Sequence, residues 1–403
     1  MRDIGFISLF SGAGGLDIGL ESAGFSCRYA ADVDAAAYAT LAENKRRNSK
    51  HLRHAVIEQS DVSRATGKQI LDAVGATRGQ IPLLVGGPPC QSWSSAGHQK
   101  GWHDPRGRLF DDFVRIADEL DVRWLMFENV RGLLTARGPD GEPGSALALI
   151  RTKLLNAGFQ TQVALLNAAD YGVPQRRVRL VVFGYKIGGQ LAFPSPVRAK
   201  NDCDSPWVSM KMALAGLSPL GGDEVIRPNA KLYEQLSSLS PGSGVKSPGK
   251  AEATRPGGHW GYKQGAFIAD AELAARTVTA NQQQDWVIDP HLGIRRLCPR
   301  ECAALQSFPA DWAFAGSRTD QYRLIGNAVP PLLAEQIGSA LHSHIVRSWN
   351  ESRACADQLA PLAPKLSAAI NYTAREERRN GPSRRAAPDL RRRSSAGVAF
   401  VGR

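Results

Sequence analysis

Short apolar runs alternate with longer stretches of helical spacing through the first 185 residues. The runs 4–10, 27–31, 83–86, 124–127, 160–168 and 178–184 predict strands, and the stretches 16–23, 109–120 and 147–156 predict helices. The run 124–127 is apolar throughout, which is typical of a strand buried on both faces of a parallel sheet. We therefore expect an α/β domain with a doubly wound sheet over residues 1–185.

The pattern changes after residue 185. Residues 186–293 consist of short polar segments rich in Ser, Gly and Pro, which predict a second, smaller domain with little regular core. Helical spacing then returns, with Pro299 at the first turn of one helix and a second helix over 332–346. Residues 349–403 lose this spacing, and residues 371–403 hold nine arginines against three acids, so we expect a disordered basic tail.

Composition narrows the class of protein. The 403 residues are 43% hydrophobic, no apolar stretch is long enough to span a membrane, and the first residues do not resemble a signal peptide. We expect an intracellular protein. The net charge of +12 favours a polyanionic partner. The six cysteines are scattered without a C-x-x-C pair, so we expect neither a disulfide framework nor a metal site.

Candidate chemistry lies in the loops that follow the strands. A glycine-rich turn over 11–15 leaves backbone N–H groups free to meet a ligand, which would suit a dinucleotide-dependent dehydrogenase equally well. Asp32 ends the next strand and could accept hydrogen bonds from ribose hydroxyls, while Asp61 could accept one from an adenine amino group. Either acid could instead be a turn residue or a helix cap.

The loop 86–97 carries a cysteine directly after two prolines. The prolines restrict the backbone and the flanking glycines allow sharp turns, so Cys90 is held as a nucleophile would be, although a buried structural cysteine fits as well. Glu128 ends the buried strand that begins at residue 124, where it could be catalytic, a helix cap or part of a surface ion pair. Arg177 and Arg179 share one face of a predicted strand, pointing into a site or forming a basic edge.

Six motifs in series resemble those of the DNA (cytosine-5)-methyltransferases, which use S-adenosylmethionine. They are FSGAGG (10–15), GPPCQS (87–92) with its continuation to Arg106-Gly107, FENV (127–130), QRRVR (175–179), residues 296–309 and GNAVP (326–330). The resemblance spans about residues 4–345. It implies a Rossmann-like methyltransferase domain over 1–185 that residues 294–348 rejoin, and a target-recognition domain over 186–293 across a DNA-binding cleft.

The resemblance also implies catalytic roles. Cys90 would attack carbon 6 of cytosine as a thiolate, which makes carbon 5 nucleophilic. Glu128, kept protonated or sharing a proton, would hydrogen-bond N3 and the exocyclic amine. Arg179 would contact the O2 side of the base, and Arg177 would help to activate and position the cysteine.

Binding residues carry over in the same way. Phe10 would stack on the adenine, the turn after it would approach the methionine moiety, and Asp32 and Asp61 would hold the ribose and the adenine amine. The cofactor-binding set that the resemblance implies is Phe10, Ser11, Gly12, Gly14, Gly15, Asp32, Val33, Asp61, Val62, Gly87, Pro89, Leu109, Asn327, Ala328 and Val329. The DNA-binding set is Gln91, Ser94, Arg106 and Thr277.

The resulting hypothesis is a cytoplasmic monomer that methylates carbon 5 of a flipped cytosine in double-stranded DNA. It would be the modification half of a bacterial restriction-modification pair, with a cognate endonuclease as partner, or a solitary enzyme. Methylation of tRNA with the same residues is one alternative, but the long recognition region and the absence of a Cys-Phe-Thr tripeptide favour DNA. An inactive DNA-binding relative is another, but all four catalytic residues are present.

Overall fold

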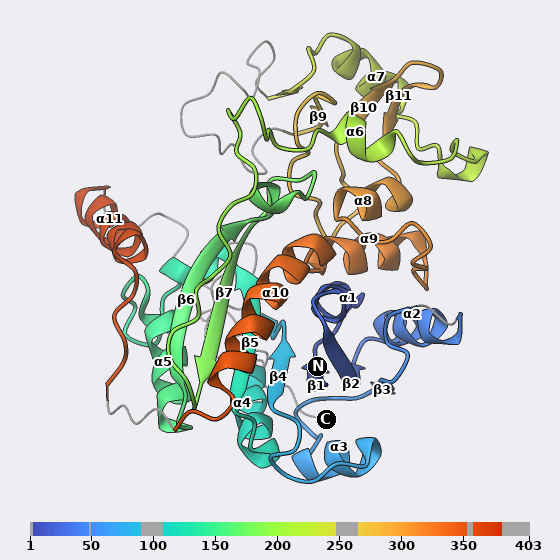
Figure 1. Ribbon diagram of the computed structural model, residues 1–403. Helices are drawn as coiled ribbons and strands as arrows, with labels where there is room; N and C mark the ends of the chain where they lie inside the picture. Colours follow the sequence, from blue (N-terminus) through green and yellow to red (C-terminus); the bar gives the residue numbers. More distant parts are fainter. Residues whose placement is uncertain (1–2, 48–49, 90–107, 247–264, 353–357, 381–403) are drawn as a thin grey trace, which may run out of the picture.

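The structure is a computed structural model that describes residues 3–47, 50–89, 108–246, 265–352 and 358–380 (Figure 1). Four predicted site residues, Cys90, Gln91, Ser94 and Arg106, lie outside the described residues. So does the C-terminal part of the predicted tail, residues 381–403.

A seven-stranded sheet forms the larger part of the molecule, with the strand order β3-β2-β1-β4-β5-β7-β6. Five strands are parallel: β1 (Ile4–Leu9), β2 (Phe25–Asp32), β3 (Val56–Gln59), β4 (Leu83–Gly86) and β5 (Trp124–Val130). β6 (Gln160–Asn167) and β7 (Val178–Tyr185) complete the sheet as antiparallel neighbours. The order reverses beside β1, and this is where open α/β sheets bind ligands. The α/β fold predicted from the alternating pattern is confirmed.

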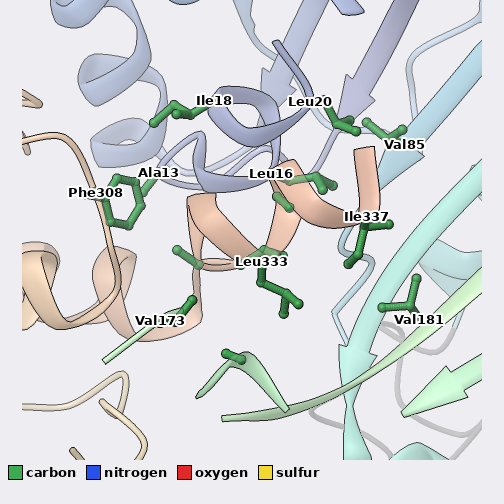
Figure 2. Close-up of a cluster of buried hydrophobic side chains, with 14 of the residues drawn as sticks. Ala13, Leu16, Ile18, Leu20, Val85, Val173, Val181, Phe308, Leu333 and Ile337 are labelled. Atoms are coloured by element: carbon green, nitrogen blue, oxygen red, sulfur yellow. The ribbon is translucent and has the colours of Figure 1, made fainter. Parts of the chain in front are cut away.

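Helices cover both faces of this sheet. One face packs against α1 (Gly15–Ser22), α2 (Ala35–Arg46) and α10 (Pro331–Ser348). The other packs against α3 (Gly67–Val74), α4 (Leu109–Leu120) and α5 (Ser145–Asn156). Figure 2 shows part of the first core, with Leu16 and Leu20 of α1 and Leu333 and Ile337 of α10 in the same apolar cluster. α10, although it comes near the end of the chain, therefore belongs to the same domain as the first strand.

The smaller part of the molecule contains a four-stranded sheet of order β11-β10-β9-β8 (top of Figure 1). Its strands are short: β8 (Ser243–Gly244), β9 (Phe267–Ile268), β10 (Trp286–Asp289) and β11 (Gly293–Arg296). α6 (Met210–Leu214), the 3-10 helix η6 (Gly222–Glu224) and α7 (Ala230–Ser237) precede them. A small core gathers around Trp286, as expected of a region with little regular core. α8 (Pro299–Leu305) and α9 (Arg318–Asn327) lead back to the large sheet.

The expected disorder over residues 349–403 is wrong for one segment, because residues 364–380 form α11 (Pro364–Asn380). Leu366 is buried in the core on the α4–α5 face of the sheet, and Ile370 lies against Gly144. α11 contacts the 3-10 helix η4 (Arg131–Thr135), which directly follows β5. An apolar stripe at helical spacing thus orders this segment despite its arginine-rich end.

The chain that leads to α11 is also anchored. Gln160 donates from Nε2 to the carbonyl oxygen of Gln358 at 3.0 Å, and the buried Arg151 donates to that of Ala360.

None of the helices within the described ranges has the length and apolar content needed to cross a membrane.

Candidate active site

One cavity of about 470 Å³ opens at the carboxyl ends of the parallel strands. Its wall combines the turn after β1, the end of β2, the loop after β4, the end of β5 and the loop between α9 and α10. Predicted cofactor-binding and catalytic residues therefore face the same cavity. Those that line it are Phe10, Ser11, Gly12, Gly15, Asp32, Val33, Gly87, Pro89, Leu109, Glu128, Arg177, Arg179, Asn327, Ala328 and Val329.

The glycine-rich turn is shaped by its contact with the α9–α10 loop. Phe10 adopts a left-handed backbone conformation, with φ at 56°, and brings the chain back over the strand end. A Cβ atom on Gly15 would lie 2.1 Å from the carbonyl oxygen of Val329, so only glycine fits there. Gly14, another predicted cofactor residue, precedes α1 and does not line the cavity. The two loops together close one end of the cavity.

Asp32 organises the adjoining wall. Its carboxylate accepts hydrogen bonds from the backbone N–H groups of Gly12 and Asp34, both at 2.9 Å. Burial raises the pKa of this carboxyl, and the two hydrogen bonds oppose the shift. Val33 is 61% exposed beside it, although it is apolar. An apolar side chain next to a half-buried acid suits a ligand with both an aromatic ring and hydroxyl groups.

Asp61 and Val62 are not among the residues that line the cavity. The Asp61 carboxylate accepts hydrogen bonds from the backbone N–H and the hydroxyl of Ser63, and these bonds lower its pKa. Val62 is buried in the core on the α3 side of the sheet. In this structure Asp61 therefore stabilises its own turn, one of the two alternatives that its sequence position leaves open.

Glu128 and Arg179 form a nearly buried ion pair inside the cavity. Arg179 Nε lies 2.7 Å from Glu128 Oε1, and the two side chains are 11% and 12% exposed. Burial raises the pKa of the Glu128 carboxyl, and the positive charges of Arg179 and Arg177 oppose that shift. The pair arises from antiparallel pairing of β5 with β7, which sets Glu128 opposite Val181, two residues beyond Arg179. The pKa of Glu128 is therefore determined by its burial and by the two arginines beside it.

Arg177 lines the same cavity, but its guanidinium is bound by main-chain oxygens. It donates to the carbonyl oxygens of Gly326 at 2.8 Å, Ala328 at 2.9 Å and Val278 at 3.2 Å. β7 begins at Val178, so Arg177 lies just before the strand. Arg177 and Arg179 both line the cavity, and Arg177 additionally joins three separate segments.

The loop after β4 is tied to the end of β5. Asn129 donates from Nδ2 to the carbonyl oxygen of Pro88 at 3.2 Å and accepts the N–H of Val130 at 2.7 Å. Gly87 lies close to Glu128 Oε2, because a Cβ atom there would be 3.9 Å from that oxygen. Pro89 is the last described residue of this loop. Gly87, three residues before Cys90, is therefore positioned beside the carboxyl of Glu128.

Three residues in or beside the site were not predicted from the sequence. Asn129 follows the acid in the FENV motif, and this adjacency is the signal that could have revealed it. Arg323 lines the cavity and forms an ion pair with Asp34 at 2.7 Å. The two residues are 289 positions apart in the sequence, and a local sequence pattern cannot predict a contact over that separation. Trp312 donates from Nε1 to the carbonyl oxygen of Ala13 at 3.1 Å and so supports the glycine turn from behind.

Thr277, a predicted DNA-binding residue, is exposed outside this cavity. Its hydroxyl donates to the carbonyl oxygen of Arg176 at 2.7 Å. The backbone around it pairs with the segment before β7, since Arg176 N–H donates to the carbonyl oxygen of Ala275 at 2.8 Å. The smaller part of the molecule is thus joined to the catalytic sheet beside Arg177.

An open α/β sheet with a glycine turn, the Glu128–Arg179 ion pair at a strand end and a second small sheet is an arrangement found in DNA methyltransferases. The model of the C-5 cytosine-specific DNA methylase family matches residues 4–343, and the chain belongs to this family. The protein is accordingly a DNA (cytosine-5)-methyltransferase, as the motif resemblance implies.

Curated relatives agree with this assignment. The Type II methyltransferase M1.HphI of Haemophilus parahaemolyticus is 31% identical over 83% of this chain and 86% of its own length. M.FnuDI of Fusobacterium nucleatum is 32% identical over 81% of this chain and 91% of its own length. Both are named as Type II methyltransferases.

Solved structures share the fold. A DNA modification methyltransferase encoded within an E. coli prophage superposes with a TM-score of 0.63 at 24% identity, covering 85% of this chain and all of the other. The S. pombe Dnmt2 methyltransferase gives 0.59 at 17% identity, covering 85% and 99%. At these identities the likeness concerns the fold alone.

Proposed function

We propose that this enzyme methylates carbon 5 of a cytosine within a specific DNA sequence, using S-adenosylmethionine and covalent attack by Cys90. The observation that carries the proposal is the Glu128–Arg179 pair in the wall of a cavity that also contains the glycine turn. Burial raises the pKa of the Glu128 carboxyl and so favours its protonated form, and a cytosine ring under nucleophilic attack needs a proton donor.

The cavity suits S-adenosylmethionine. Phe10 would stack on the adenine, and the Asp32 carboxylate, which already accepts two backbone N–H groups, has lone pairs left for ribose hydroxyls. Residues 327–329 would close the pocket from the α9–α10 loop, and Leu109 would do so from α4. When bound, the cofactor supplies an electrophilic methyl group.

The residues of the chain would prepare the base to accept that methyl group. The Cys90 thiolate adds to carbon 6, and negative charge moves onto the ring. Glu128 stabilises this charge through a proton held at N3 and a hydrogen bond with the exocyclic amine, while Arg179 faces the O2 side. After methylation, loss of the carbon-5 proton and elimination of Cys90 restore both the aromatic ring and the enzyme.

We also propose how DNA is engaged. The target cytosine leaves the duplex, at an unstacking cost of a few kcal/mol, and enters the cavity at Glu128. Gln91, Ser94 and Arg106 would contact the opened DNA, and Thr277 would contact the phosphate backbone. Residues 186–293 would read the sequence, and the enzyme would act as a monomer, alone or beside an endonuclease of the same specificity.

Labelled S-adenosylmethionine incubated with duplex DNA or with tRNA tests the reaction. We expect label in DNA at a single sequence context, which bisulfite sequencing of host DNA would identify. Label in tRNA alone, or none in either, would contradict the proposal.

A second experiment tests the nucleophile. DNA that carries 5-fluorocytosine at the target should form a covalent adduct with the wild-type enzyme, because the fluorine cannot leave as a proton does. Cys90→Ser should form none. Persistence of the adduct in Cys90→Ser would reject Cys90 as the nucleophile.

A further inference from the structure

Two buried glutamines connect the cofactor cavity to the smaller domain. Gln306, which follows α8, donates from Nε2 to the carbonyl oxygen of Ile325 at 2.6 Å. Its Oε1 accepts a hydrogen bond from Nε2 of Gln175 at 2.9 Å. Gln175 accepts the N–H of Val278 at 2.8 Å and donates to the carbonyl oxygen of Leu305 at 3.2 Å. Both glutamines are fully buried.

Arg177 makes a second connection between the same segments. It bonds the carbonyl oxygen of Val278 and those of Gly326 and Ala328, so both backbone groups of Val278 are held by residues just before β7. The contact is also sterically tight, because a Cβ atom on Gly326 would lie 2.2 Å from the carbonyl oxygen of Thr279. A shift of either segment must therefore move the other.

The connected segments have different surroundings. Residues 326–329 line the cofactor cavity. Val278 lies between β9 and β10 of the smaller sheet, next to the exposed Thr277. The glutamines thus span the distance between the proposed cofactor pocket and the proposed DNA-reading domain.

Apolar packing alone would bury this junction without fixing its register. A buried amide that loses its partner is destabilised because water cannot replace the lost hydrogen bond, so each glutamine strongly favours the one arrangement in which all of its partners are in place. Such a network has one low-energy geometry and suits a junction that must be set to a particular position.

We infer that Gln306 and Gln175 are positioning residues that couple occupancy of the cofactor cavity to discrimination between DNA sequences. When the 326–329 wall closes on a cofactor, the network holds Val278 and the smaller sheet in the position that reads the target. Coupling is reciprocal, so cognate DNA strengthens cofactor binding by the same factor. The inference rests on the proposed function but concerns residues outside the catalytic set.

Gln306→Leu tests the network, with Gln160→Leu as a matched control. Gln160 is also a buried glutamine bonded to a main-chain oxygen, but it lies on β6 at the far edge of the sheet. The measurement is the dissociation constant of cognate and non-cognate duplexes, with and without S-adenosylhomocysteine. Cofactor affinity by calorimetry and the thermal midpoint accompany it.

In the wild type and in Gln160→Leu we expect the cofactor product to tighten cognate binding at least about fivefold, the lower end of typical coupling. The ratio to compare is the dissociation constant of the cognate duplex without S-adenosylhomocysteine divided by that with it. In Gln306→Leu this ratio should fall to within about twofold of 1. A purely structural role would lower the thermal midpoint and leave the ratio unchanged, and that result would overturn the inference. A wild-type ratio near unity would also overturn it.

If Gln306→Leu does not fold, Gln306→Met keeps the unbranched shape without the donor and should give the same loss of coupling. The proposed function fails separately, through absence of methyl transfer by the wild type. Methyl transfer by the wild type together with an intact ratio in the variant would reject the coupling role alone.

Discussion

Arg179 Nε lies 2.7 Å from Glu128 Oε1 at the end of β5, and the solvent reaches little of either side chain. Burial favours the neutral carboxyl, whereas the guanidinium favours the carboxylate, and burial is the larger effect. The balance between these two effects determines how readily Glu128 gives or takes a proton.

Glu128→Gln should retain DNA binding and lose methyl transfer by about 100- to 10,000-fold, the usual contribution of a positioned proton donor. The amide fills the same space but cannot supply a proton to the ring. Single-turnover methylation and DNA-binding assays on the same preparation measure both effects. A rate near that of the wild type would remove the role assigned to Glu128.

Arg179→Met should move the alkaline limb of the pH–rate profile to higher pH. The protonated form of Glu128 is present below its pKa and is lost as the pH rises through that pKa. Arg179 lowers this pKa, so removing the guanidinium raises it and extends the protonated form to higher pH. Arg64→Met, which alters an exposed arginine, is the control and should leave the limb in place. A limb that stays or moves to lower pH in Arg179→Met would contradict the assignment.

Asp17→Asn should stabilise the protein increasingly as the pH rises. Asp17 is fully buried on α1, and burial raises its pKa from 3.8 to about 7. Between these values the unfolded chain has released the proton and the folded chain still holds it, so stability falls as the pH rises from about 4 to about 7. At 1.36 kcal/mol for each unit, the full loss is on the order of 4 kcal/mol.

Urea unfolding of the wild type and of Asp17→Asn at pH 5 and pH 8 measures this effect. The gain from asparagine should be larger at pH 8, because the folded wild type then carries a buried charge. Equal gains at pH 5 and pH 8 would contradict the raised pKa, because a carboxyl already ionised in the folded protein at pH 5 gives the same difference at both values.

Gly15→Ala should weaken cofactor binding by about 5- to 150-fold, which corresponds to overpacking by about 1–3 kcal/mol. The new Cβ would lie 2.1 Å from the Val329 carbonyl oxygen and 3.2 Å from Phe308, so the wall of the cavity must shift. Gly189→Ala is a suitable control, since no atom lies within 4 Å of the added Cβ. Calorimetry with S-adenosylhomocysteine gives both affinities, and equal values would refute the steric argument.

Leu366→Ala should destabilise the protein by about 2–4 kcal/mol, because Leu366 is 7% exposed in the core beneath α11. Tyr372→Ala, on the same helix but 66% exposed, should change stability little. Chemical unfolding compares the two variants. Equal, small effects would mean that α11 contributes little to the folded state.

Deletion of residues 381–403 should reduce the salt dependence of DNA binding. This stretch contains six arginines and one aspartate, and each phosphate neutralised contributes about 0.9 to the slope of log affinity against log salt. The methylated sequence should not change. An unchanged slope would show that the arginines do not contact DNA.

Local pattern was sufficient for most of the secondary structure and for the order of the motifs. The strand 83–86 and the helix 109–120 match β4 and α4 residue for residue, because both are short segments with one dominant apolar pattern. Glu128 could be assigned to the cavity since any residue at the carboxyl end of a buried parallel strand lies at that edge.

Long-range packing decided the remainder. Asp61 bonds with its own turn and not with the cavity, and no periodicity distinguishes these outcomes. α11 forms because Leu366 and Ile370 find an apolar surface beside η4 and Gly144, a surface made by residues more than 200 positions earlier. Composition predicted disorder in this segment because it reflects the high content of arginine and contains no information about the apolar surface on which a helix can pack.

The sequence by itself determined the α/β class, the strand that presents Glu128, the glycine turn and the family, because these depend on residue type and local spacing. Only the tertiary structure decided that Arg177 bonds Val278, Gly326 and Ala328, and that Gln175 meets Gln306 across 131 positions. The physical reason is that a buried hydrogen bond depends on which donor and acceptor the whole fold brings within about 3 Å.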